Sequence, residues 1–293
     1  MKKGFQWVND REKLLLGRAR RVVYKSLDGG GELALHFYLP KDFREGSPRT
    51  TLLFFHGGAW DRGSVVQFAP QALYYVERGA IGVLAEYRHA ASHPGSRPSQ
   101  SYQDGRAAVR YLRQQAGELN LDPTRIVVVG GAAGGNIAGA LALGAPLSKA
   151  EAAFKPPESR PDGAILLSTI FEVVKGGLGY PACGDASEAK LVSLSRYHEG
   201  ACPPMLVVHG NADRLVPMEE ATAFATRLER KKVPHRLVEF EGRDRDFFNL
   251  NVDPVSYEAV LAEMDRFLDE HGLLKHDPSH EGPHVISRRE SDY

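Results

Sequence analysis

The sequence contains only two cysteines, Cys183 and Cys202, among its 293 residues. Two thiols in a chain of this length do not form the dense disulfide framework of small secreted domains, so we interpret both as free thiols. No run of eighteen apolar residues occurs, and the sequence therefore predicts no transmembrane helix. Polar residues at positions 9–13 interrupt the apolar stretch that a signal peptide needs. We expect a cytoplasmic protein.

An excess of either charge is also missing. The 37 Lys and Arg residues balance the 37 Asp and Glu residues, which gives a formal net charge of zero. A balanced chain offers no basic surface for nucleic acid or for an anionic membrane, and we expect neither partner. Nothing in the sequence bears on the number of subunits.

Short apolar runs alternate with segments of helical periodicity along most of the chain. This alternation predicts an α/β fold with a doubly wound, mostly parallel sheet. The expected strands are residues 22–24, 33–39, 51–55, 81–88, 126–129, 164–168, 205–208 and 235–240. The expected helices are residues 68–78, 102–115, a segment starting at 137, 219–230 and 255–271.

The domain organisation follows from the polar ends of this pattern. Residues 1–19 are predicted to form an N-terminal arm with helical spacing, and residues 20–272 a single domain. Residues 273–293 are polar, contain prolines and lack periodicity, and are predicted to be a tail. Inside the domain, residues 171–200 are irregular and rich in small residues. They are expected to form an excursion over a pocket, which could serve as a lid.

The most informative stretch is residues 126–136, with the sequence IVVVGGAAGGN. Four β-branched residues run into closely spaced glycines, and an apolar helical pattern follows. This is the layout of a nucleophile elbow, in which a buried strand turns sharply into a helix around a G-x-S-x-G core. The central position of that core is Ala132, which has no hydroxyl group.

Three further motifs follow predicted strands in a fixed order. They are HGGAW at 56–60, HGNADRLVP at 209–217 and GRDRDFFN at 242–249. Together with the glycine-rich elbow, they make residues 20–272 resemble the α/β-hydrolases of the bacterial esterase and lipase group, which includes hormone-sensitive-lipase-like and feruloyl-esterase-like proteins. The resemblance implies an α/β-hydrolase fold that uses no cofactor and no metal.

The resemblance also implies roles for particular residues. Main-chain N–H groups near Gly57, Gly58 and Ala133 would line an oxyanion hole. His56 and Trp60 would border the same pocket. Asp213 would be the triad acid, which holds the catalytic imidazole in the correct tautomer. The implied partner is a small-molecule ester or carboxylate.

Two positions depart from the family pattern. Ala132 stands at the position of the nucleophilic serine, and Arg245 stands at the position of the catalytic histidine. An arginine stays protonated and has no lone pair to accept a proton, so it cannot act as the general base. Removing such groups from serine hydrolases costs on the order of 10⁶ in kcat. We therefore predict a protein that is defective in ester hydrolysis.

Other residues do not restore the missing groups in the sequence pattern. Ser168 and Ser193 lie outside the elbow, and His235 is expected at the start of a strand. His89 and His93 lie in the loop after the fourth predicted strand and could reach the mouth of the pocket, but a structural role is favoured for both. Three tail histidines are spaced by four, but prolines between them oppose a helix, and no metal site is expected there. These are His276, His280 and His284.

Three hypotheses remain open. The first is a pseudoenzyme whose glycines preserve the turn and pocket, with Arg245 either paired to Asp213 or turned inward as part of a carboxylate site. The second is a carboxylic ester hydrolase inactivated by a serine-to-alanine exchange. The third is nucleophile-free, lyase-type chemistry in the same pocket, with a carboxylate as the base. The candidate bases are Asp213, Asp244 and Asp246.

Overall fold

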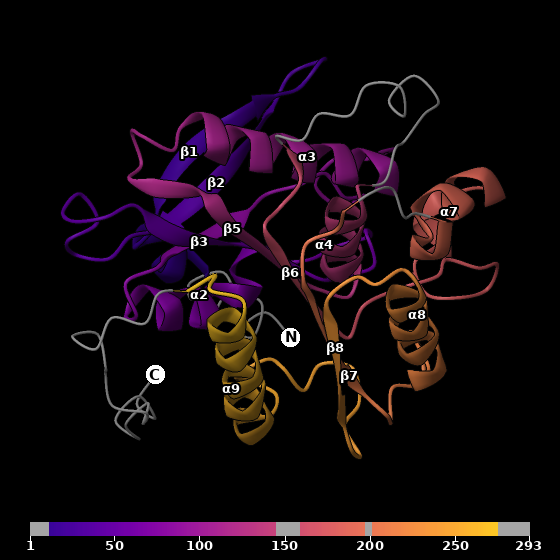
Figure 1. Ribbon diagram of the computed structural model, residues 1–293. Coiled ribbons are helices and arrows are strands. Elements are labelled where there is room, and N and C mark those ends of the chain that lie inside the picture. The colour runs from indigo at the N-terminus through magenta and orange to yellow at the C-terminus, as the bar shows by residue number, and fades with distance from the viewer. Residues whose placement is uncertain (1–11, 145–158, 197–200, 275–293) are drawn as a thin grey trace.

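The computed structural model describes residues 12–144, 159–196 and 201–274, and places eight strands in one sheet (Figure 1). The strand order is β1-β2-β4-β3-β5-β6-β7-β8. Strand β2 pairs antiparallel with β1 and β4, and the remaining pairs are parallel. The predicted α/β class and mostly parallel sheet are confirmed. The strands are β1 (Arg20–Ser26), β2 (Glu32–Tyr38), β3 (Arg49–Phe55), β4 (Ile81–Ala85), β5 (Leu121–Gly131), β6 (Gly163–Leu167), β7 (Met205–Gly210) and β8 (His235–Phe240).

Helices cover both faces of this sheet. Helices α3, α4 and α8 pack on one face, and α2 and α9 pack on the other. Successive strand residues point to opposite faces, so Leu53 and Phe55 join the first core while Leu52 and Phe54 join the second. Both faces of the sheet are covered by helices, which explains why the central strands are continuous apolar runs. The longer helices are α2 (Ala69–Val76), α3 (Pro98–Gln114), α4 (Ala133–Leu143), α8 (Met218–Arg230) and α9 (Pro254–Glu270).

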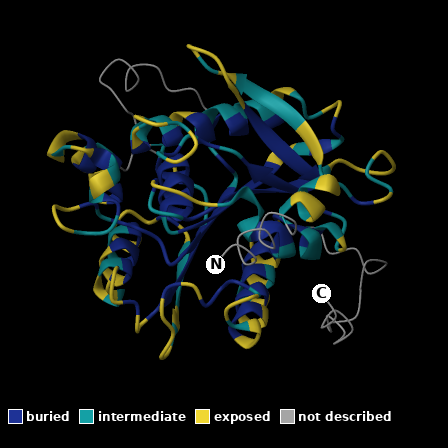
Figure 2. Cartoon of the chain, turned by 180° about the vertical axis from the view of Figure 1, so that it is seen from behind, coloured by how far each residue is buried: buried dark blue, intermediate teal, exposed yellow. Residues whose placement is uncertain are grey.

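The burial pattern shows the same layering, with buried central strands and with exposed residues on the outer sides of α3, α8 and α9 (Figure 2). Among the described residues, no helix is both long enough and apolar enough to cross a membrane.

Two helices begin earlier than their sequence pattern predicts. Helix α3 begins at Pro98 rather than 102, because a proline at the first helical position gives up an N–H that would have no partner there. Helix α4 begins at Ala133 rather than 137 and includes Gly134 and Gly135. These glycines have poor helix propensity, and close packing against the sheet overrides it.

The predicted domain boundaries are only partly covered by the described residues. A helical segment at 12–17 precedes β1, while residues 1–11 and the tail from 275 onward, with its three histidines, lie outside the description. Residues 171–196 hold the short helices α6 (Tyr180–Cys183), α7 (Ala186–Val192) and η3 (Leu194–Arg196). Helix α7 contacts α3, where the Ser99 N–H donates to the Glu188 carboxylate over 2.7 Å. A lid role for residues 171–200 stays a prediction, and 197–200 lie outside the description.

Candidate functional site

The turn between β5 and α4 has an unusual backbone at Ala132. Its φ of 52° and ψ of −111° are sparsely populated by residues with a side chain, and such conformations cost about 1–3 kcal/mol. The Ala132 N–H donates to the Leu167 carbonyl over 3.0 Å, and the Ala132 carbonyl accepts from the N–H groups of Asn136 (3.1 Å) and Ile170 (3.2 Å). The surrounding structure therefore enforces a sharp turn that presents a methyl group.

Glycines allow the turn to pack tightly against its neighbours. A Cβ on Gly134 would lie 2.0 Å from the carbonyl oxygen of Phe55, at the end of β3. A Cβ on Gly130 would lie 2.1 Å from the carbonyl oxygen of Gly134, and one on Gly135 would lie 2.1 Å from Oγ1 of Thr169. These contacts fix β3, β5 and α4 at a separation that larger residues cannot reach.

The loop after β3 runs beside this turn. A Cβ built on Gly57 would lie 3.4 Å from the Cβ of Ala132, so the HGGAW segment borders the elbow. The Gly57 N–H does not face an open site: it donates to Oε1 of Gln67 over 2.6 Å. Within the described residues, the N–H groups of Gly58 and Ala133 donate to no protein acceptor. Two of the three expected donors are therefore unengaged, and the third is engaged by the chain itself.

His56 and Trp60 are packed into the interior. The His56 ring stacks on Tyr87 with 4.3 Å between ring centroids, and the Tyr87 hydroxyl donates to the His56 carbonyl over 2.7 Å. Burial lowers the pKa of His56 to about 4, so the ring is neutral at pH 7 and Nδ1–H can donate to the Gly57 carbonyl 2.7 Å away. Trp60 is only 2% exposed. Both side chains are buried, and their place on a pocket wall stays a prediction.

Asp213 and Arg245 form a buried ion pair. Asp213 follows β7, and its Oδ1 accepts from the N–H groups of Leu215 (2.9 Å) and Val216 (3.0 Å). Its Oδ2 accepts from Nη1 of Arg245 over 3.0 Å, and Nη2 of Arg245 donates to the Ser168 carbonyl over 2.9 Å. Arg245, at the position where the family motif would have an imidazole, therefore pairs with the carboxylate that the same resemblance makes the triad acid.

The electrostatic surroundings keep this guanidinium charged. Burial lowers the pKa of Arg245, and four nearby carboxylates oppose that shift. An arginine remains protonated at any ordinary pH. Within the described part of the chain its five N–H donors make two hydrogen bonds, so donors remain for an added anion. The four carboxylates belong to Asp213, Asp246, Asp244 and Glu220.

Gln67 and Asn249 are site residues that the sequence did not indicate. Nε2 of Gln67 donates to Oδ1 of Asn249 over 3.1 Å, and Nδ2 of Asn249 donates to the Asp246 carbonyl over 3.0 Å. Gln67 lies on the short helix η1 (Val65–Phe68), far from Asn249 in the sequence. Asn249 ends the GRDRDFFN motif, which could have identified it, whereas no motif includes Gln67.

His209 and Glu220 also adjoin the ion pair. Nε2 of His209 lies 2.9 Å from the Val216 carbonyl and 3.8 Å from Oδ2 of Asp213, and burial lowers the pKa of this ring. The neutral imidazole therefore secures the loop that carries Asp213. Burial raises the pKa of Glu220. His209 belongs to the HGNAD motif, where sequence analysis could have singled it out.

The remaining candidates lie in several places. Ser168 is fully buried beside the turn with φ 42°, while Ser193 donates to the Ala189 carbonyl over 2.9 Å. His235 begins β8, as predicted. His89 is buried with its ring centroid 5.4 Å from that of His56. Among the described residues, no group of three or more His, Cys, Asp or Glu is arranged to hold a metal ion.

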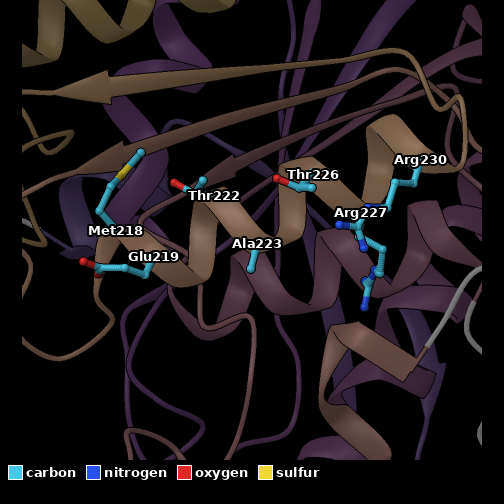
Figure 3. Close-up of a pocket in the computed structure, with 7 residues that line it drawn as sticks. All are labelled: Met218, Glu219, Thr222, Ala223, Thr226, Arg227 and Arg230. Atoms are coloured by element: carbon cyan, nitrogen blue, oxygen red, sulfur yellow. The ribbon is translucent and has the colours of Figure 1, made fainter.

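A separate hollow of about 570 Å³ runs along the outer face of α8 (Figure 3). All of its lining residues come from this one helix, and none is a predicted site residue, so it is distinct from the β5–α4 turn. They are Met218, Glu219, Thr222, Ala223, Thr226, Arg227 and Arg230.

Known proteins match both the sequence and the fold. The BD-FAE family model matches residues 35–165. Carboxylesterase NlhH of Mycobacterium tuberculosis is 36% identical over 116 residues, which cover 39% of this chain and 35% of the relative. The probable carboxylic ester hydrolase LipM of the same organism is 25% identical over 246 residues, covering 78% of this chain and 56% of the relative. The chain thus spans about a third and about half of the length of these two curated relatives.

Solved structures of Thermogutta terrifontis esterase 2 match nearly the whole fold. The structure phosphoramylated by tabun has a TM-score of 0.79 and 33% sequence identity, and the match covers 89% of this chain and 98% of the esterase. The butyrate-bound structure has the same TM-score and identity, with 88% and 96% covered. Sequence identity at this level over nearly the full length of both chains establishes common descent, and the chain belongs to the α/β-hydrolase esterase family.

Proposed function

We propose that this protein binds a short-chain carboxylate or ester at the β5–α4 turn and does not hydrolyse esters through an acyl-enzyme. One observation carries the proposal. The enforced turn at Ala132 presents a methyl group, and the side chain paired with Asp213 is a guanidinium rather than an imidazole. A nucleophile and a general base are both missing from the positions where the family's chemistry needs them.

The remaining groups support ligand binding. The N–H groups of Gly58 and Ala133 have no acceptor within the described residues, and Arg245 has donors to spare. N–H groups and a guanidinium together suit a carboxylate. Thermogutta terrifontis esterase 2 has been solved with butyrate and with propionate bound, which supports a short carboxylate as the ligand class.

Hydrolysis of p-nitrophenyl butyrate tests the first half of the proposal. The parent protein, Ala132→Ser, Arg245→His and the double variant are compared, after circular dichroism has shown that each is folded. We expect turnover with an initial burst from the double variant alone, because only this variant has both a nucleophile and a base. Saturable turnover by the parent protein would contradict the proposal. Turnover by Ala132→Ser alone would instead identify a hydrolase inactivated by a single exchange.

Titration with butyrate tests the second half. Saturable shifts of the Gly58 and Ala133 amide resonances are expected with butyrate and not with butanol, which lacks the charge. Arg245→Met should weaken butyrate binding, since it removes the guanidinium. Absence of saturable shifts at these amides would overturn the binding proposal.

A second candidate is proton abstraction without a nucleophile. Two observations favour it: burial raises the pKa of Asp246 and of Glu220, which makes each carboxylate a better base. Deuterium incorporation at the α-carbon of methyl phenylacetate in D₂O, followed by NMR, would reveal this activity. No exchange above the buffer rate would exclude it for esters of this type.

A further inference from the structure

We propose that Gln67 is a built-in competitor for the ligand, whose side-chain carbonyl must leave the Gly57 N–H before a ligand oxygen can bind there. This inference rests on the proposed binding function. If the inference holds, Gln67 sets the affinity for the ligand through its own hydrogen bond with the Gly57 N–H.

The contact lies at the turn. A Cβ built on Gly57 would have the Cβ of Ala132 at 3.4 Å and Oε1 of Gln67 at 3.5 Å, so both side chains lie beside Gly57. The Gly57 N–H already donates to Oε1 of Gln67 over 2.6 Å, slightly shorter than the usual N–H···O distance. A carboxylate or ester oxygen that approaches this N–H therefore competes with an amide oxygen at very high local concentration.

The other end of the Gln67 amide is also recognised. Nε2 donates to Oδ1 of Asn249 over 3.1 Å, and the Asn249 amide is oriented by its own donation to the Asp246 carbonyl. The site thus offers a donor, Gly57 N–H, and an acceptor, Asn249 Oδ1, which match the two ends of a carboxamide. A carboxylate can replace only the oxygen end, so displacing Gln67 costs the Asn249 contact as well.

Gln67 is placed so that it can move. It is only half-buried and sits on η1, a four-residue 3₁₀ helix whose first turn is held by Ser64, with Oγ accepting from the Val66 N–H at 3.4 Å. The bridge it makes joins the loop after β3 to the loop after β8, which also carries Arg245. Both loops flank the turn, so withdrawal of Gln67 separates two walls of the same site.

Two substitutions at Gln67 have opposite expected effects on butyrate affinity, measured by calorimetry or NMR titration. Gln67→Ala frees the Gly57 N–H and should tighten binding by at least about fivefold and up to about 30-fold, because the ligand no longer has to displace the two ordinary hydrogen bonds that Gln67 makes. Gln67→Glu keeps an acceptor on Gly57 and adds a negative charge, so it should weaken binding by at least about fivefold. Gln103→Ala, an exposed glutamine on α3, is the matched control and should bind butyrate as the parent does.

Hydrogen exchange at the Gly57 amide gives a reading without ligand. Exchange should be slow in the parent and clearly faster in Gln67→Ala, whose circular dichroism spectrum should match that of the parent. If Gln67 only stabilised the site by bridging Gly57 and Asn249, both substitutions would weaken butyrate binding, and the inference would be wrong. Equal affinity of the parent and Gln67→Ala would overturn it while leaving the binding function intact. No butyrate binding by any variant would overturn the proposed function and this inference with it.

Discussion

Nη1 of Arg245 lies 3.0 Å from Oδ2 of Asp213, and both residues are more than nine-tenths buried. Asp213 lies in the loop after β7 and Arg245 in the loop after β8. Arg245 donates to one oxygen of the Asp213 carboxylate, and two backbone N–H groups donate to the other. This buried ion pair supports the proposal that the chain lacks the movable proton of an esterase.

Breaking this ion pair should be costly. Asp213→Asn or Arg245→Met alone should each lower the free energy of unfolding by about 3 kcal/mol, because each leaves the other charge buried without its partner. The double substitution should recover much of that loss, since neither charge then remains. Urea unfolding of the four proteins measures the coupling. Strictly additive losses would show that the pair contributes no interaction of its own.

Ala132→Gly should stabilise the protein by about 1 kcal/mol. Glycine accepts the positive φ at this position without strain, and this gain exceeds the extra entropy that glycine loses on folding. The same exchange at Ala138, in the middle of α4, relieves no strain and should destabilise by about 1 kcal/mol. Thermal unfolding of both variants gives the comparison. A destabilised Ala132→Gly would mean that the backbone here is unstrained.

Gly134→Ala should destabilise by about 3 kcal/mol or more, because its new methyl group would overlap the Phe55 carbonyl oxygen 2.0 Å away. That atom belongs to the backbone of the central strand and cannot rotate aside. The control is Gly117→Ala, where nothing lies within 4 Å of the added atom and a change of at most about 0.5 kcal/mol is expected. Chemical denaturation compares the two, and equal stabilities would show that α4 can shift away from β3.

Stability should fall in mild acid through His56. Burial lowers the pKa of the folded ring to about 4, whereas an unfolded histidine titrates near 6.5. Below about pH 6.5 the unfolded state therefore takes up a proton that the folded state refuses until about pH 4. Stability is complete above this window and should drop by about 2 kcal/mol from His56 alone between pH 7 and pH 5.

Unfolding of the parent and of His56→Gln at pH 7 and pH 5 measures this contribution. The pKa values of His89 and His209 are also lowered by burial, so the variant should lose less stability than the parent while still losing some. If His56→Gln lost as much stability between pH 7 and pH 5 as the parent does, His56 would be ruled out as a source of acid sensitivity.

The alternation of short apolar runs and helical segments was enough to predict the fold. A run such as 51–55 is apolar at every position because both faces of β3 are covered, and this signal is local. The start of α4 was predicted four residues late, since the glycines at 134 and 135 look like loop residues until their contacts with β3 and with Thr169 are known.

The sequence motifs indicated only some residues of the candidate site. The order of the motifs indicated that Asp213 and the Arg245 loop would meet, but left open whether the guanidinium would pair or point inward. In the structure the guanidinium pairs with Asp213 and also donates to the Ser168 carbonyl, a contact that no motif indicates. Gln67 was missed for a similar reason: its partners are a backbone N–H ten residues away and a side chain 182 residues away.

That long separation has a consequence for how the protein is made. Strands β3 to β8 pair in parallel with one another, so no β-hairpin can assemble the site from neighbouring segments. Contacts between residues that are distant in the sequence form slowly. During synthesis, the link from Gln67 to Asn249 cannot close until the last strand and the loop after it have left the ribosome. Arg245 lies on the same late loop, so a ligand that needs its guanidinium would bind only chains whose last strand has emerged, and would act as a reporter of that stage.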